Sequence, residues 1–210
     1  MKKLMLLLSL FNVICSYAQT KAVTENGDEV ILYDNKTWDY SDKNTKQEKE
    51  IKTNNETFNK SKDATFYLKS KNLPEVGIHL NTKKWKFEKS KSEEASEYEF
   101  ELKDKDAYAM IITERIEVPL ETLKGIALDN ARAIAPDMKI IFQEYRIVND
   151  KKVFCMQMNG TVKGIKVAYL GYYYSYENGS LQFLSYTSQS LYKEFKDELE
   201  TLLNGLEVSK

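Results

Sequence analysis

The sequence predicts an α+β fold: a mainly antiparallel sheet with two packed helices, preceded by a short β-hairpin unit. Short runs in which apolar and polar residues alternate recur along the chain, as expected for strands with one buried face. Turn pairs separate these runs, and the clearest is Asn178-Gly179, whose residues tolerate the positive φ of tight hairpins. Two other stretches carry apolar residues at helical spacing. Grouped strands followed by helices favour α+β over an alternating α/β arrangement.

The first 18 residues have the composition of a secretory signal peptide. Lys2 and Lys3 precede an apolar run over residues 4–14, and Ser16 and Ala18 place small residues where signal peptidase reads the chain. We therefore expect cleavage after Ala18 and export to the periplasm or the cell exterior. The run is shorter than the ~20 residues that span a bilayer, so we expect no transmembrane anchor in the mature chain.

The two cysteines have different expected fates. Cys15 leaves with the signal peptide, and the bulky Ile14 and the polar Asn12 before it argue against a lipoprotein. Cys155 then has no cysteine partner, so no intrachain disulfide is expected. On a strand it is expected to be a small buried hydrophobe rather than a reactive thiol.

The charge of the chain is nearly balanced. The precursor has a net charge of −1, which becomes −3 when Lys2 and Lys3 are removed. Lysine and glutamate are interspersed, so neither nucleic acid nor an anionic membrane surface is an expected partner.

Residues 19–40 are predicted to form a small β unit. Val30–Tyr33 is a strong strand-forming run, turn-forming residues lie on both sides of it, and residues 37–40 return as a further short strand. Strands this short are marginally stable alone, and Trp38 and Tyr40 supply apolar area for packing.

Residues 41–63 are predicted to form a flexible polar linker. Ile51 and Phe58 are its only hydrophobic side chains, so burial cannot offset the entropy of ordering it. A frayed helix over residues 45–52 is the alternative.

The main α+β domain is predicted to span residues 64–210. Its strands are expected at 65–68, 77–80, 85–87, 98–102, 108–117, 139–148, 152–158, 165–176 and 181–187. Pro119 opens one helix, where a missing N–H costs nothing, and Pro136 ends it. Ser190 is expected to cap a second helix, whose apolar stripe reaches Leu206.

Three stretches of the main domain resemble a known family. They are residues 109–116 leading into Val118–Glu121, the Gly171–Ser175 run, and residues 182–187 before the closing helix. Together they resemble the PsbP/Mog1-like domain of exported Bacteroidota proteins, over roughly residues 66–208. Residues 29–38 resemble a short β module found at the mature N-terminus of such proteins.

The resemblance implies a fold and a tendency to bind, and nothing finer. Family members serve as non-catalytic binding or assembly subunits, in photosystems or with a small GTPase. No residues of those interfaces match this chain. An unknown protein, glycan or small ligand of the cell envelope is therefore the expected partner.

The most unusual feature of the mature chain is a tyrosine cluster. We predict ligand contacts from Tyr172, Tyr173, Tyr174 and Tyr186, which would form an aromatic wall for a glycan, peptide or apolar ligand. The alternative is a central strand covered on both faces, with these rings in the core.

No catalytic, metal or cofactor site is predicted. His79 is the only histidine, and one histidine with one cysteine cannot complete a tetrahedral metal site. Glu97, Glu99 and Glu101 alternate with apolar residues and are expected to form a solvated face. We therefore expect an exported, non-catalytic binding or accessory protein of unknown ligand. A hydrolase that depends on carboxylates alone and acts on envelope or extracellular substrates is the alternative.

Overall fold

The computed structural model describes residues 20–23, 29–34, 36–41, 51–91 and 96–209. The chain divides into two units, Met1–Glu50 and Ile51–Lys210. The predicted signal peptide, residues 1–18, lies outside the described residues, as does most of the alternative helix over 45–52.

The N-terminal unit contains a three-stranded antiparallel sheet in the order β1-β2-β3. Its strands are β1 (Thr20–Val23), β2 (Glu29–Leu32) and β3 (Trp38–Tyr40). The turn between β2 and β3 closes where the Tyr33 amide donates to the Thr37 carbonyl at 2.9 Å. Lys36 has a φ of 64°, the left-handed conformation that such a turn requires.

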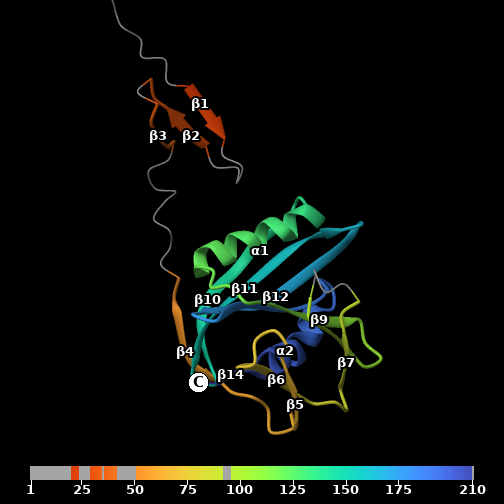
Figure 1. Ribbon diagram of the computed structural model, residues 1–210. Helices are drawn as coiled ribbons and strands as arrows, with labels where there is room; N and C mark the ends of the chain where they lie inside the picture. Colours follow the sequence, from red (N-terminus) through yellow and green to blue (C-terminus); the bar gives the residue numbers. More distant parts are fainter. Residues whose placement is uncertain (1–19, 24–28, 35, 42–50, 92–95, 210) are drawn as a thin grey trace, which may run out of the picture. The chain divides into compact units, whose positions relative to one another are not determined.

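The described residues of the second unit form a larger set of elements (Figure 1). The strands are β4 (Thr53–Phe58), β5 (Phe66–Lys69), β6 (Val76–Leu80), β7 (Trp85–Lys89), β8 (Tyr98–Leu102), β9 (Ala107–Glu114), β10 (Lys139–Val148), β11 (Lys151–Val162), β12 (Ile165–Tyr176), β13 (Gly179–Ser188) and β14 (Leu206–Val208). The helices are α1 (Leu120–Ile134) and α2 (Tyr192–Leu203).

The described strands of this unit form two sheets. The larger has the order β4-β10-β11-β12-β13-β9-β8-β7, and the smaller has the order β14-β6-β5. Tight turns connect β10 through β13 as hairpins. Asn149 and Asp150 both have positive φ in the first turn, and Lys163 and Gly164 do in the second, as the I′ hairpin turn needs. The predicted α+β class, mainly antiparallel with two packed helices, is confirmed.

The large sheet buries side chains on both faces because strand residues alternate sides. Tyr172 packs into one core with α2 and the smaller sheet, whereas its neighbour Tyr173 packs into a second core with α1. The second core includes residues of β10 to β13 but none of β7 to β9. On the α1 side, β8 presents the exposed Glu99 and the half-buried Glu101.

Two segments differ from the sequence prediction. Within the predicted linker, residues 53–58 form β4, which pairs in parallel with β10. This polar segment is ordered by backbone hydrogen bonds to β10 and by the packing of Phe58 against the core that contains Tyr172. At the other end, α2 stops at Leu203, so Leu206 belongs to β14 rather than to the helix. Ser190 does not cap α2, which begins after Leu191 without a side-chain cap.

Candidate functional site

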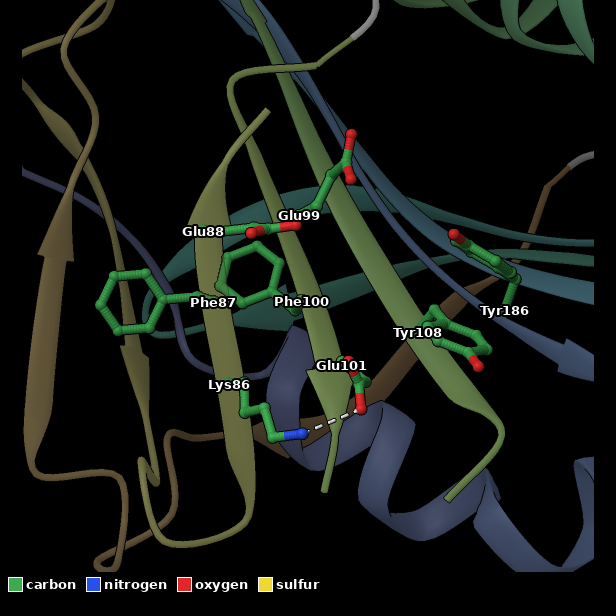
Figure 2. A pocket seen from close by; sticks show the side chains of 8 residues that line it. All are labelled: Lys86, Phe87, Glu88, Glu99, Phe100, Glu101, Tyr108 and Tyr186. Atoms are coloured by element: carbon green, nitrogen blue, oxygen red, sulfur yellow. Dashed lines mark hydrogen bonds and ion pairs between the residues drawn. The ribbon is translucent and has the colours of Figure 1, made fainter. Parts of the chain in front are cut away.

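A cleft of about 380 Å³ lies over β7, β8, β9 and β13 (Figure 2). Its size is at the lower end of the range for sites that bind small molecules, ~300–1,000 Å³. Its lining residues are Lys86, Phe87, Glu88, Glu99, Phe100, Glu101, Tyr108 and Tyr186. They come from four strands, so the cleft exists only once the sheet has formed.

The strand sequences explain how the lining is presented. In β8, Tyr98, Phe100 and Leu102 are buried, which leaves Glu99 and Glu101 on the opposite face. In β9 small alanines lie on the core side and Tyr108 lies on the cleft side. Asp104 has a φ of 58°, which permits the tight reversal that brings β8 and β9 together.

The pairing registers place five side chains in one row across the sheet. Lys86 is opposite Glu101, and Glu101 is opposite Tyr108. Tyr108 is opposite Tyr186, and Tyr186 is opposite Tyr169. The Tyr108 and Tyr186 ring centroids are 5.6 Å apart with planes inclined by 26°, and Tyr186 and Tyr169 are 5.3 Å apart. Three phenol rings therefore form a continuous aromatic row, the tyrosine row, across β9, β13 and β12.

The cleft has a mixed but mainly acidic lining. The Lys86 ammonium pairs with Glu101 at 3.1 Å, as Figure 2 shows. Glu99 Oε1 accepts hydrogen bonds from the hydroxyls of Ser90, at 2.7 Å, and Ser96, at 3.3 Å. The serines are neutral, so they orient the Glu99 carboxylate without cancelling its charge.

The environment keeps the Tyr186 phenol protonated. Burial, followed by the neighbouring Tyr169, Glu99 and Tyr108, raises its pKa to about 12. Burial also raises the pKa of Tyr169. Tyr186 is thus a neutral aromatic surface beside carboxylates, suited to stacking, hydrogen bonding and cation–π contact.

The four tyrosines predicted as ligand contacts occupy three environments. Tyr186 lines the cleft. Tyr172 and Tyr173 are fully buried, in the two separate cores, and present no surface to a ligand. Tyr174 is half-buried and stacks against Tyr176 with centroids 5.7 Å apart. The period-two alternation predicted for this strand is therefore present, and it directs most of these rings into the protein.

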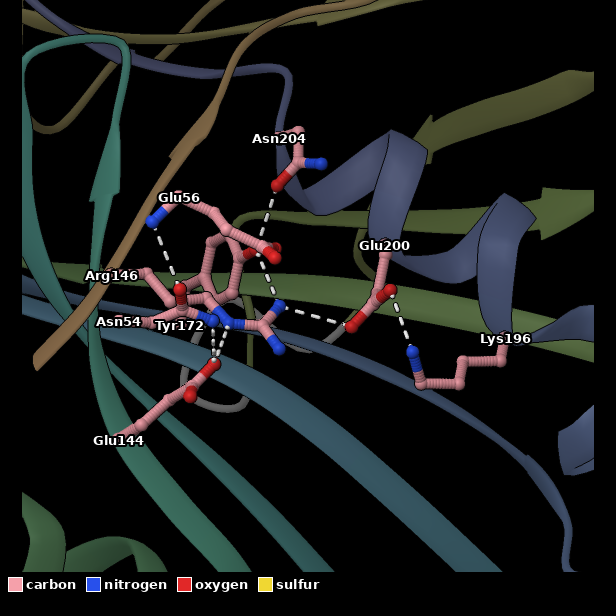
Figure 3. Close-up of polar contacts among 8 residues, drawn as sticks. All are labelled: Asn54, Glu56, Glu144, Arg146, Tyr172, Lys196, Glu200 and Asn204. Atoms are coloured by element: carbon pink, nitrogen blue, oxygen red, sulfur yellow. Dashed lines mark hydrogen bonds and ion pairs between the residues drawn. The ribbon is translucent and has the colours of Figure 1, made fainter. Parts of the chain in front are cut away.

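A second polar cluster surrounds Arg146, which is only 6% exposed (Figure 3). Its Nε donates to Glu144 at 2.5 Å, and its Nη1 donates to Glu200 at 3.0 Å and to the Tyr172 hydroxyl at 3.1 Å. The Tyr172 hydroxyl in turn donates to Asn204 at 2.7 Å. We call these five residues the Arg146 cluster.

The Arg146 cluster joins several elements. The guanidinium lies 4.4 Å from the centroid of the Phe58 ring, and Asn54 donates to Glu144 at 3.3 Å. These contacts connect β4 to β10, while Glu200 and Asn204 connect the sheet to α2 and its end. The arrangement satisfies buried charges with other protein groups, which is typical of a structural ion-pair network.

The remaining candidates from the sequence are not brought into the cleft. Cys155 is fully buried, which confirms the predicted core position. Burial raises the pKa of its thiol to about 12, although the nearby Arg146 opposes this shift. His79 lies on β6, where its Nε2 is 2.9 Å from Glu207 and 3.0 Å from the Lys60 ammonium. Hydrogen bonds from Lys60 and His79 hold the pKa of Glu207 below its usual range.

The prediction that Glu97 belongs to a solvated face is wrong. Glu97 is 8% exposed and accepts hydrogen bonds from the hydroxyls of Ser70 and Thr113, at 2.7 and 2.5 Å, and from the Lys71 amide. It precedes β8, so the alternation of that strand does not apply to it.

Sequence reasoning missed Lys86, Glu88 and Tyr108 as cleft residues. The alternation in β8 predicted an exposed position for Glu101, but no face was predicted for Tyr108, and only the pairing registers bring these strands together. Across residues 20–23, 29–34, 36–41, 51–91 and 96–209, no group of three or more His, Cys, Asp or Glu side chains is arranged to hold a metal ion. No helix in these ranges is long and apolar enough to cross a membrane.

Comparisons with known proteins give structural similarities at low sequence identity. No protein-family model matches the chain, and no curated protein matches it in sequence. Similar solved structures include cyanobacterial PsbP (CyanoP) from Synechocystis, which is 12% identical, with 64% of this chain and 86% of that chain covered and a TM-score of 0.47.

Two further solved structures show comparable similarity. LpqN of Mycobacterium tuberculosis, described as involved in cell envelope biogenesis, is 9% identical, with 64% of this chain and 83% of that chain covered and a TM-score of 0.47. A protein from Bacteroides thetaiotaomicron is 11% identical, with 65% of this chain and 46% of that chain covered and a TM-score of 0.41.

Proposed function

We propose that this chain is an exported, non-catalytic binding or accessory protein whose ligand occupies the cleft over β7, β8, β9 and β13. The observation that supports this proposal is the tyrosine row beside exposed carboxylates in a cleft of about 380 Å³. Tyrosine is enriched at binding surfaces because its ring offers apolar area and its hydroxyl a polar contact. The partner is a protein, glycan or small ligand of the cell envelope.

Export is the second part of the proposal. The signal-like residues 1–18 and the resemblance to exported Bacteroidota proteins support it. Expression of the full chain in a bacterial host tests it, with fractionation and determination of the mature N-terminus. We expect a periplasmic or secreted product that begins at Gln19. A cytoplasmic product that retains Met1 or Lys2 would contradict export.

Ligand screening by NMR tests the binding function. The mature protein is titrated with glycans, peptides and small fragments, and binders are ranked by shifts at Tyr108 and Tyr186. We expect Tyr186→Ala to abolish the response, whereas Tyr33→Ala, an exposed tyrosine in the N-terminal unit, leaves it unchanged. If no compound of any class shifts the cleft signals, the proposed binding site is wrong.

A carboxylate-dependent hydrolase is the second candidate function. Glu99 and Glu101 both line the cleft from alternate positions of β8, which places their Cα atoms ~7 Å apart. Glycoside hydrolases use two carboxyl groups that are themselves ~5–10 Å apart, and these two glutamates lie on the same face of β8. Release of reducing sugar from envelope polysaccharide, lost in Glu99→Gln but retained in Glu177→Gln, would favour this function over simple binding.

A further inference from the structure

The charges of the cleft favour a positively charged ligand. Its lining carries three carboxylates, from Glu88, Glu99 and Glu101, against the single ammonium of Lys86. Lys86 is already paired with Glu101 at 3.1 Å. The excess negative charge therefore lies at Glu88 and Glu99, which are opposite each other on β7 and β8.

The tyrosine row also favours a positively charged ligand. Tyr108 and Tyr186 stand beside the carboxylates, and the faces of aromatic rings attract ammonium and guanidinium groups. The protein uses this contact elsewhere, since the Arg146 guanidinium lies over Phe58 and the Lys152 ammonium lies 4.3 Å from the centroid of the Tyr145 ring. A carboxylate beside an aromatic face is a favourable site for a lysine or arginine side chain.

The shape of the site favours a peptide over a small cation. Lys86, Glu101, Tyr108 and Tyr186 lie on four adjacent strands, so the row spans three strand spacings, or ~14 Å. An extended peptide covers this length with about four residues. A single small cation would contact only part of the row.

We propose that the cleft binds an extended segment of a partner protein through its lysine or arginine side chains. This inference rests on the proposed binding function and names the chemistry of its ligand. One cationic side chain lies between Glu88 and Glu99, and the rest of the segment runs across Tyr108 toward Tyr186.

Titration with charge-matched peptides tests the inference. The probe is a short peptide of alternating glycine and lysine, and its control is the same peptide with every lysine acetylated, which removes the charge but keeps most of the shape. We expect the charged peptide to bind at least about tenfold more tightly at low salt, and added salt to weaken it. Free lysine amide is a third probe, and it is expected to bind more weakly than the peptide.

Variants locate the effect within the cleft. The double variant Glu88→Gln, Glu99→Gln keeps the size of both exposed side chains, and we expect it to weaken binding of the charged peptide about tenfold. The matched control is Glu177→Gln, an exposed glutamate outside the cleft lining, which should change the affinity less than about twofold.

The outcomes separate this inference from the function on which it rests. If the acetylated peptide binds equally well, or the double variant binds as tightly as the wild type, the ligand is not cationic. The cleft would still be a binding site if other compounds shift Tyr108 and Tyr186. If free lysine amide binds as tightly as the peptide, the ligand is a small organic cation and not an extended protein segment.

Discussion

The Arg146 cluster and the cleft contain the same kinds of residue in opposite settings. Each combines tyrosine, glutamate and a basic side chain. In the Arg146 cluster these groups bond to one another, and the arginine side chain is 7% exposed. In the cleft the Lys86 and Glu101 side chains are 54% and 47% exposed. Composition therefore does not locate a binding site, whereas the access of its polar groups to a ligand does.

Perturbed pKa values do not separate the two regions either. Burial raises the pKa of Tyr172 in the Arg146 cluster, and it also raises the pKa of Tyr186 in the cleft to about 12. Structural ion-pair networks perturb pKa values just as functional sites do. The exposure of neighbouring carboxylates such as Glu99 is the feature that differs.

The largest expected effect is the loss of the buried charge in the Arg146 cluster. Arg146→Ala leaves Glu144 and Glu200, whose side chains are 13% and 17% exposed, without their common partner. We expect the free energy of unfolding to fall by about 3–5 kcal/mol, as measured by chemical denaturation. A loss below about 1 kcal/mol would mean that the cluster does not stabilise the fold.

The next effect concerns a single hydroxyl in each region. Tyr172→Phe removes the group that donates to Asn204 and accepts from Arg146, and should cost about 1–3 kcal/mol of unfolding free energy. Tyr186→Phe, in the half-buried cleft position, should cost less than about 0.5 kcal/mol. Equal losses in the two variants would contradict the structural distinction between the regions.

The pH dependence of stability reports on the buried core beside the Arg146 cluster. The pKa of Cys155 is raised from 9.0 to about 12, so the folded state holds its proton more tightly than the unfolded state. This contribution is complete below pH 9.0 and is lost as the pH rises through about 12, by at most ~1.4 kcal/mol per pH unit.

Denaturation curves measured at increasing alkaline pH test this dependence. Cys155→Ala should remove the decline that begins near pH 9.0 and leave the later decline from tyrosines such as Tyr186. If the variant and the wild type show the same pH slope, the thiol does not contribute to it.

Breaking the ion pair of the cleft is also expected to have only a small effect on stability. Lys86→Ala breaks an exposed pair with Glu101, and such pairs contribute less than about 1 kcal/mol. Its effect should appear in binding instead, because it increases the negative charge of the cleft. Peptide titration of Lys86→Ala should therefore show an equal or higher affinity for the lysine probe, and a marked loss would contradict the charge argument.

Local alternation in the sequence predicted much of the fold. It located most strands, and it correctly assigned Tyr172 and Tyr173 to opposite faces of β12. It could not predict β4, because the polar residues 53–58 carry no hydrophobic pattern and are ordered by parallel pairing with a distant strand. Such pairing depends on contacts far apart in the sequence.

The candidate site was predictable only in part for the same reason. Tyr186 was identified from the density of tyrosines, but Tyr108 and Lys86 reach the cleft through pairing registers that no local pattern specifies. The sequence did not predict the burial of Arg146 either, since arginine is rarely buried unless partners distant in the sequence surround it.

The most direct test of this account is a map of NMR shift changes on addition of the lysine-containing peptide. We expect the largest changes at the cleft residues of β7, β8, β9 and β13, with Tyr108, Tyr186 and Glu99 foremost. Signals of Arg146 and Tyr172 should change little. Changes confined to β4 and α2 around the Arg146 cluster, or absent from the cleft, would contradict the assignment of the cleft as the ligand surface.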